Sequence, residues 1–188
     1  GSSYPSVVES GVHGVAVKAH HNVGGIPEDN SFQHIFHPLH ELFKDEIRII
    51  AKELDCPPDY IWQKPFPGVG LAIRVLGEVT PEKVALVQHA DQILEEEFTK
   101  ANFIHKVSQL FTVLSDKSFV CSKGDIVTME YMMILRAVVT NDYLTAEIAE
   151  VPYKLLKQVT SRIINEVGHI NRVVYEVTGK PSGTIEWE

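Results

Sequence analysis

Residues 109–140 read QLFTVLSDKSFVCSKGDIVTMEYMMILRAVVT, and this stretch decides the fold. Its segments 109–114, 118–122 and 131–140 are rich in β-branched and aromatic residues, which favour strands. Lys123, Gly124 and Asp125 lie between the second and third segments and are typical of a turn. We therefore predict that these segments form strands of a mainly antiparallel sheet.

Two amphipathic helices flank these strands in the sequence. Thr80 and Pro81 indicate a helix start, because Thr caps the first turn and Pro fits its first position. The apolar stripe of this helix consists of Val84, Val87, Ala90, Leu94 and Phe98. Pro152 opens a second helix that ends at Gly168, and its apolar face consists of Leu156, Val159, Ile163 and Val167. Further strands are predicted over 71–79 and 172–178. The predicted fold class is α+β, a two-layer domain with both helices packed on one face of the sheet.

A segment rich in proline and glycine, KPFPGVG at 64–70, divides the chain, because it cannot sustain a helix or a central strand. Upstream of it, Pro38 is expected to open a helix whose apolar positions recur every three or four residues, and Pro57 and Pro58 stop this helix. Residues 12–27 read as a strand end that enters a flexible loop. We predict two parts, residues 1–64 and residues 65–188.

Bulk composition limits the class of protein. The 188 residues are 44% hydrophobic and 22% charged, which is ordinary for a globular protein with a buried core. The net charge of -8 opposes binding to nucleic acid through its phosphates. No apolar run approaches the roughly 18 residues of a membrane span, and the start lacks the regions of a signal peptide. We expect a cytoplasmic protein whose partners include neither nucleic acid nor membrane, with Cys56 and Cys121 reduced and the acidic run 95–97 solvated.

A loop near the start gathers hydrogen-bond donors. Lys18, His20, His21 and Asn22 precede two glycines, an arrangement typical of a mobile element that closes over an anion. Metal binding is the competing interpretation, but adjacent histidines rarely bind one ion together and no third ligand has a favourable spacing. His34, His37 and His40 are expected to be surface or packing residues, so no metal site is predicted.

The final residues, KPSGTIEWE at 180–188, follow a strand-like run and Gly179. A cation, a turn, an apolar residue, an acid and an indole suit a folded hook that returns Lys180 and Glu186 to a site while Trp187 anchors it. The alternative is that Trp187 only covers the core. The residues alone leave both interpretations open.

Several of these segments carry a family resemblance. The matching segments are 17–25 (VKAHHNVGG), 41–48 (ELFKDEIR), 65–74 (PFPGVGLAIR), 135–138 (LRAV), 162–167 (RIINEV), 171–175 (NRVVY) and the tail 180–188. In this order they resemble the C-terminal part of the glutamine-hydrolysing GMP synthetase family, over nearly the whole chain. The resemblance implies that residues 1–64 are the end of an ATP pyrophosphatase domain and that residues 65–188 are a dimerisation domain.

The resemblance also implies an activity for the intact enzyme. ATP, with Mg, activates the xanthine O2 of xanthosine monophosphate as an adenylyl intermediate, pyrophosphate leaves, and ammonia from a glutaminase domain displaces AMP to give GMP. Lys18, His20, His21 and Asn22 would lie on the catalytic lid. The pyrophosphatase loop, of the Ser-Gly-Gly-Val-Asp-Ser type, and the glutaminase cysteine do not occur in these 188 residues. We therefore expect this stretch to be inactive alone and to hold no cofactor tightly, with the ATP pyrophosphatase and glutaminase domains and a second copy as partners.

By the same resemblance, the residues that contact the xanthosine nucleotide are Gln109, Lys180, Ile185 and Glu186. Lys180 can pair with a phosphate, while Gln109 and Glu186 offer hydrogen bonds. Arg172 is similar to an arginine that reaches the site of a neighbouring subunit.

One departure from the family pattern leaves alternatives open. The family's Gly-Asp-x-Arg turn reads Gly124-Asp125-Ile126-Val127 here, and an arginine lost from a phosphate would cost about 1.5–3 kcal/mol of binding. A structural homodimerisation module without nucleotide binding is therefore an alternative. A small RNA-binding α+β domain is another, which the acidic charge opposes.

Overall fold

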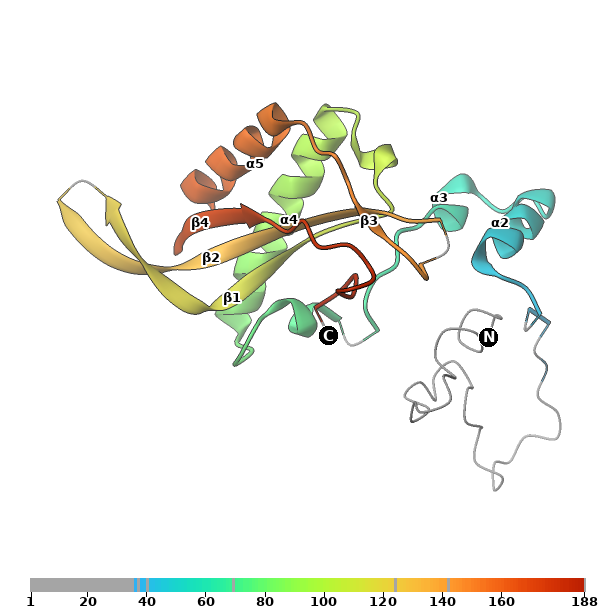
Figure 1. Cartoon of the computed structure of the whole chain (residues 1–188), viewed down its shortest axis with the longest axis horizontal. Helices are drawn as coiled ribbons and strands as arrows, with labels where there is room; N and C mark the ends of the chain where they lie inside the picture. Colours follow the sequence, from blue (N-terminus) through green and yellow to red (C-terminus); the bar gives the residue numbers. More distant parts are fainter. Residues whose placement is uncertain are drawn as a thin grey trace, which may run out of the picture. The chain divides into compact units, whose positions relative to one another are not determined.

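A computed structural model describes residues 36, 38–39, 41–68, 70–123, 125–141 and 143–187. The chain divides into two compact units, Gly1–Gln63 and Lys64–Glu188, and the division adjoins the proline-rich segment 64–70 (Figure 1). The predicted lid residues Lys18, His20, His21 and Asn22 lie outside the described residues, as do His34, His37 and His40. The functional identity of the two units stays a prediction.

The first unit contains the helices α2 (Lys44–Glu53) and α3 (Pro58–Ile61). The predicted helix start at Pro38 is wrong, because α2 begins six residues later. There the amide of Phe43 donates to the carboxylate of Glu46 at 2.7 Å, and acidic residues in the first turn suit the positive end of a helix. The predicted stop is correct, although Pro58 also opens α3. No residue of α2 is buried, so its predicted apolar stripe is exposed or only partly covered within this unit.

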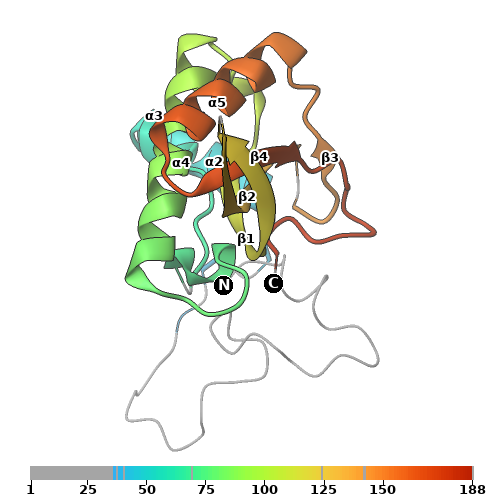
Figure 2. The ribbon, with the colours of Figure 1, turned by 90° about the vertical axis from the view of Figure 1, so that its left-hand side faces the viewer.

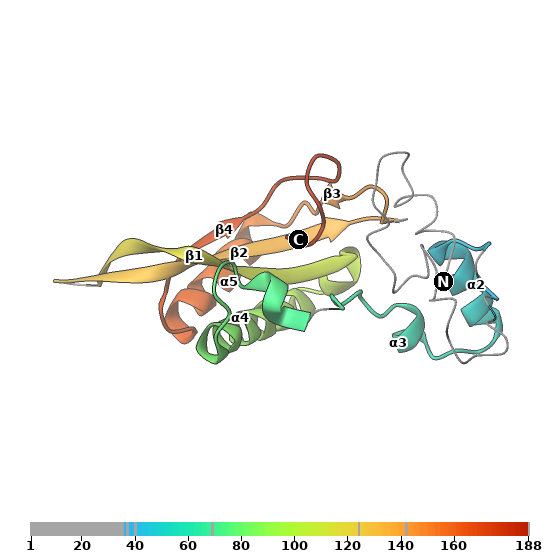
Figure 3. The same ribbon diagram turned by 90° about the horizontal axis from the view of Figure 1, so that it is seen from below.

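In the second unit, two helices cover one face of a four-stranded sheet (Figures 2 and 3). The helices are α4 (Pro81–Lys100) and α5 (Tyr153–Glu166), and the strands are β1 (Gln109–Lys123), β2 (Ile126–Val139), β3 (Glu147–Ile148) and β4 (Ile170–Tyr175). Strand β2 pairs antiparallel with β1 and β3 and parallel with β4. This arrangement confirms the predicted α+β class.

The strand predictions need two corrections. Segments 109–114 and 118–122 form one strand, β1, with an irregularity in its pairing between Leu114 and Ser118. The strand predicted over 71–79 is wrong, because this segment contains the 3-10 helix η2 (Gly70–Arg74) and only Val75 bridges to Leu114. Gly70 and Gly77 have φ values of +78° and +80°, and such left-handed residues at both ends interrupt extended backbone.

The main core lies between the helices and the sheet. Of the predicted stripe of α4, Val87, Ala90, Leu94 and Phe98 are buried, and Val84 is partly buried and packs against this core. In α5 the buried residues are Leu155, Val159 and Ile163. The sequence predicted Leu156 on the buried face, but Leu155 is the buried residue, and Leu156 is partly buried at the edge of the core. Burying each such side chain contributes about 1.5–3 kcal/mol.

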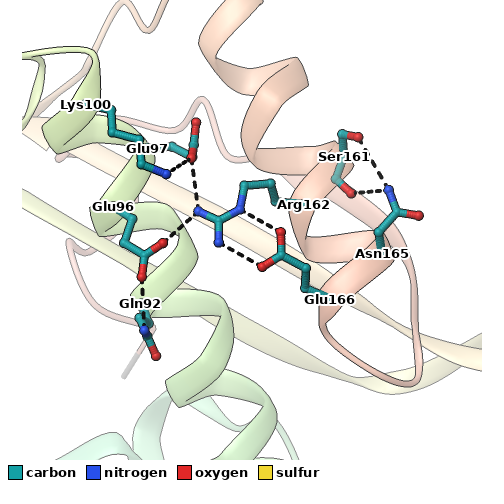
Figure 4. Close-up of polar contacts among 8 residues, drawn as sticks. All are labelled: Gln92, Glu96, Glu97, Lys100, Ser161, Arg162, Asn165 and Glu166. Atoms are coloured by element: carbon teal, nitrogen blue, oxygen red, sulfur yellow. Dashed lines mark hydrogen bonds and ion pairs between the residues drawn. The ribbon is translucent and has the colours of Figure 1, made fainter.

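The acidic run at the end of α4 is not simply solvated, which corrects the sequence interpretation (Figure 4). Arg162 of α5 donates to Glu96 at 2.7 Å and to Glu97 at 3.0 Å. It also donates two hydrogen bonds, of 2.7 and 2.8 Å, to the carboxylate of Glu166. Lys100 donates to Glu97 at 2.7 Å. The hydrogen bonds from Arg162 lower the pKa of Glu96 and of Glu166, and the one from Lys100 lowers the pKa of Glu97. This network joins the two helices.

The opposite face of the sheet is covered by the C-terminal segment (Figure 3). Because successive strand residues point to opposite faces, Phe111 and Val113 of β1 share a face with Ile134 and Val138 of β2. All four are buried although they lie outside the helix-side core. The chain end therefore forms a third, thin layer, and the candidate site is built there.

Candidate functional site

The segment from Thr178 to Trp187 folds back as a hook. Lys180 exchanges two backbone hydrogen bonds with Ala146, of 2.7 and 3.0 Å, and the amide of Gly183 donates to the carbonyl of Gly179 at 3.0 Å. A Cβ atom on Gly179 would lie 3.0 Å from the carbonyl oxygen of Ala146, so this close approach favours glycine. Ile185 is the buried apolar residue of the hook. The indole of Trp187 is 39% exposed and donates to Glu176 at 2.6 Å. Trp187 therefore anchors the hook through this hydrogen bond rather than by filling the core.

Arg136 of β2 lies under the hook and is fully buried. Its guanidinium donates to the carbonyls of Thr178 at 2.5 Å, Thr184 at 2.9 Å and Ile185 at 3.2 Å. It also forms an ion pair of 3.2 Å with Glu176, whose other carboxylate oxygen accepts from Trp187. A buried charge needs such partners, and here the hook supplies most of them.

Arg74, at the end of η2, holds the side chain of Glu186. Two bonds of 2.8 and 3.2 Å join the guanidinium to the two carboxylate oxygens, and both side chains are largely buried. The guanidinium also lies 4.3 Å from the ring centre of Phe111 and 5.4 Å from that of Phe66. A planar guanidinium suits both bidentate pairing and stacking on rings. The position of Glu186 is therefore set by Arg74.

Asp91 of α4 is the second carboxylate beside Arg74, at 3.3 Å. It accepts from the amide of Thr112 at 2.6 Å and from the Thr112 hydroxyl at 2.8 Å. The first of these bonds satisfies a backbone N–H group at the outer edge of β1. Burial raises the pKa of Asp91 to about 6, against the opposing hydrogen bonds from Thr112 and the charge of Arg74. Arg74 therefore links the hook to helix α4.

Two further predicted contacts lie in the same layer. The ammonium of Lys180 donates to the carbonyl of Tyr143 at 2.8 Å. Gln109 is buried, and its amide donates to the carbonyl of Pro65 at 3.2 Å. Gln109 lies two residues from Phe111 in β1 and so points to the hook face of the sheet. The structure thus brings Gln109, Ile185 and Glu186 to the hook face of the sheet, whereas Lys180 lies where the hook pairs with Ala146.

Arg172 does not join them within the chain. It lies on β4, is exposed, and has its guanidinium 5.1 Å from the ring centre of Phe119. Arg172 pairs with Met132 of β2, whereas Gln109 pairs with Val138 of the same strand. At a rise of about 3.3 Å per residue, these two positions are about 20 Å apart along the strand.

Val127, which replaces the family arginine, is further away still. It pairs with Ser122 near the tip of the β1–β2 hairpin and is 70% exposed. Between positions 127 and 138 of β2 the strand rise gives about 36 Å. A side chain at 127 therefore lies far from the hook of the same chain.

The chemistry of this site is that of recognition. An ammonium, an amide and a carboxylate can bind an anion and accept hydrogen bonds from a polar ligand. Among the described residues, no group of three or more His, Cys, Asp and Glu side chains could hold a metal ion. No helix within the described part of the chain is long and apolar enough to cross a membrane.

Sequence reasoning missed the residues that hold the hook. Arg74 and Arg136 were noticed only as members of matching segments, and no role was predicted for Asp91 or Glu176. One signal was available, since Arg136 interrupts the apolar run MMILRAVV at 132–139. An arginine in the middle of a buried strand requires specific partners.

Comparison with known proteins identifies relatives of this chain. Residues 96–187 match the family model described as GMP synthase C terminal domain. Over its whole length the chain is 49% identical to the GMP synthase [glutamine-hydrolyzing] of Ruminiclostridium cellulolyticum. It is 50% identical to the proteins of that name from Acetivibrio thermocellus and Symbiobacterium thermophilum. The chain spans 37% of the length of each of these relatives. These matches confirm the resemblance found in the sequence.

Proposed function

We propose that the chain is the C-terminal part of a GMP synthase, from the premise that residues 96–187 match the family model of the GMP synthase C terminal domain. In the intact enzyme it would take part in converting xanthosine monophosphate to GMP with ATP and ammonia from glutamine. The observation that carries the proposal is an identity near 50% over the whole chain to enzymes of that name. Residues 65–188 would supply dimerisation and part of the nucleotide site.

The hook layer supports the assignment of the nucleotide site. The ammonium of Lys180 suits a phosphate, and the Glu186 carboxylate can accept from N–H or O–H groups of the nucleotide while Arg74 holds it. Gln109 adds an amide from β1. When ATP is bound, it supplies the activating adenylyl group. The residues proposed to act with it, Lys18, His20, His21 and Asn22, lie outside the described part.

The β1–β2 hairpin supports the dimerisation role. Val120 and Met129 pair across the hairpin, and Val127 lies two residues further on the same face. These side chains are 67%, 60% and 70% exposed. An apolar strip of this kind is a typical protein interface, and we propose that a second copy of the chain covers it.

Isothermal titration of the chain with xanthosine monophosphate tests the nucleotide site. We expect the unsubstituted chain to bind, and we expect the dissociation constant of Lys180→Ala to be at least tenfold larger. Lys154→Ala, an exposed lysine on α5, is the matched control and should bind like the unsubstituted chain. The absence of heat at millimolar nucleotide would contradict the site and favour the dimerisation module without nucleotide binding. Sedimentation of the same sample tests the dimer, and an RNA gel shift tests the third alternative.

A further inference from the structure

We propose that Arg136 is a positioning residue for the nucleotide site, whose guanidinium holds the backbone of the hook and thereby sets where Lys180 and Glu186 stand. The nucleotide that the hook would serve rests on the proposed function.

The contacts of Arg136 connect both limbs of the hook. Thr178 lies before the turn, two residues ahead of Lys180, while Thr184 and Ile185 lie after it. The Ile185 carbonyl belongs to the peptide bond that leads into Glu186. One rigid, planar group therefore fixes the backbone beside both charged residues.

The residue type matters at this position. The neighbours of Arg136 on the same face of β2, Ile134 and Val138, are apolar and buried, so filling space does not require a charge. Carbonyls turned away from water need donors, and within the hook Arg136 supplies them to three, through one buried and two partly buried hydrogen bonds. A lysine ammonium is compact and lacks the fork of N–H groups, so it cannot reproduce contacts spread over these three carbonyls.

Arg136 acts differently from Arg74. Arg74 holds a single side chain, that of Glu186, whereas Arg136 contacts only backbone atoms within the hook itself. Loss of the guanidinium at 136 should therefore displace Lys180 and Glu186 together. If Arg136 were purely structural, its loss would instead lower the stability of the whole unit evenly.

Amide hydrogen exchange of the whole chain separates these two roles. The reporters are the amides of Lys180 and Gly183, which form hydrogen bonds within the hook layer, and the slowest amides of α4 serve as the core reference. Arg136→Lys keeps the charge and removes the fork. We expect hook amides to exchange at least tenfold faster, core amides to change less than threefold, and the dissociation constant for xanthosine monophosphate to rise at least tenfold.

Arg162→Lys is the matched control. It makes the same substitution at an arginine with four hydrogen bonds, on the helix side of the sheet. It should leave the ratio of hook exchange to core exchange unchanged. Should Arg136→Lys fail to fold, Glu176→Gln weakens the same cluster and should speed hook exchange in the same direction.

Two results would overturn the inference about Arg136. One is unchanged hook exchange in Arg136→Lys, and the other is acceleration of hook and core amides by the same factor. If the unsubstituted chain does not bind xanthosine monophosphate, the proposed function fails. The exchange measurement then still decides whether Arg136 positions the hook.

Discussion

Replacing Glu186 by Gln should destabilise the second unit by about 2 kcal/mol. The carboxylate forms two bonds with Arg74, of 2.8 and 3.2 Å, between side chains that are 12% and 6% exposed. Gln keeps the shape and one oxygen, so it loses one charge-assisted bond, which is worth about 1.5–3 kcal/mol. Asp91 remains 3.3 Å from Arg74, so the guanidinium keeps a carboxylate. The cost should therefore stay below the roughly 3–5 kcal/mol of a buried charge left without a partner.

Urea unfolding followed by far-UV circular dichroism measures this cost. The midpoint should fall while the slope stays constant, because the area exposed on unfolding does not change. Glu78→Gln, at an exposed glutamate of the same unit, is the control and should stay within about 0.5 kcal/mol of the unsubstituted chain. Equal losses in the two variants would refute the ion pair in solution.

A double-mutant cycle adds a stricter test of the same pair. Arg74→Met and Glu186→Gln should be coupled by about 0.5–3 kcal/mol, as residues in direct contact usually are. Strict additivity of the two losses would show that Arg74 does not hold Glu186.

Three other perturbations have defined outcomes. Ionised Asp91 should cost the folded state about 3 kcal/mol, because burial raises its pKa from 3.8 to about 6. Its contribution to stability is fully present below pH 3.8 and is lost as the pH rises through 6. Urea melts should therefore show a decline from about pH 4 to 6.5, which Asp91→Asn flattens. Thr80→Ala removes the side-chain cap of α4, which accepts from the amide of Lys83, and should cost about 1 kcal/mol in the same assay. Arg162→Gln should lower the melting temperature at low ionic strength. In 1 M NaCl, where charges are screened within about 3 Å, the melting temperatures of the variant and the unsubstituted chain should lie closer together. An equal drop in melting temperature in both buffers would contradict the network.

The sequence predicted the helices and strands of the second unit where local signals were strong. Thr80, Pro81 and a regular apolar stripe indicate α4, and the residue types of 109–114 and 131–140 indicate β1 and β2. The segment 71–79 was misread because its apolar residues resemble a strand. Left-handed glycines at 70 and 77 decide its backbone, and their φ values cannot be read from residue type.

For the candidate site, the sequence determined the composition of the hook and its family. It named Lys180, Ile185 and Glu186, which lie in a matching segment, and it named Gln109 through the family resemblance alone. Only the tertiary structure decided what holds them. Arg74 and Glu186 are 112 positions apart in the chain, and Arg136 is 42 to 49 positions from its carbonyl partners. Local patterns reveal which residues must be buried, whereas the choice among distant partners depends on strand register and on the path of the chain end across the sheet.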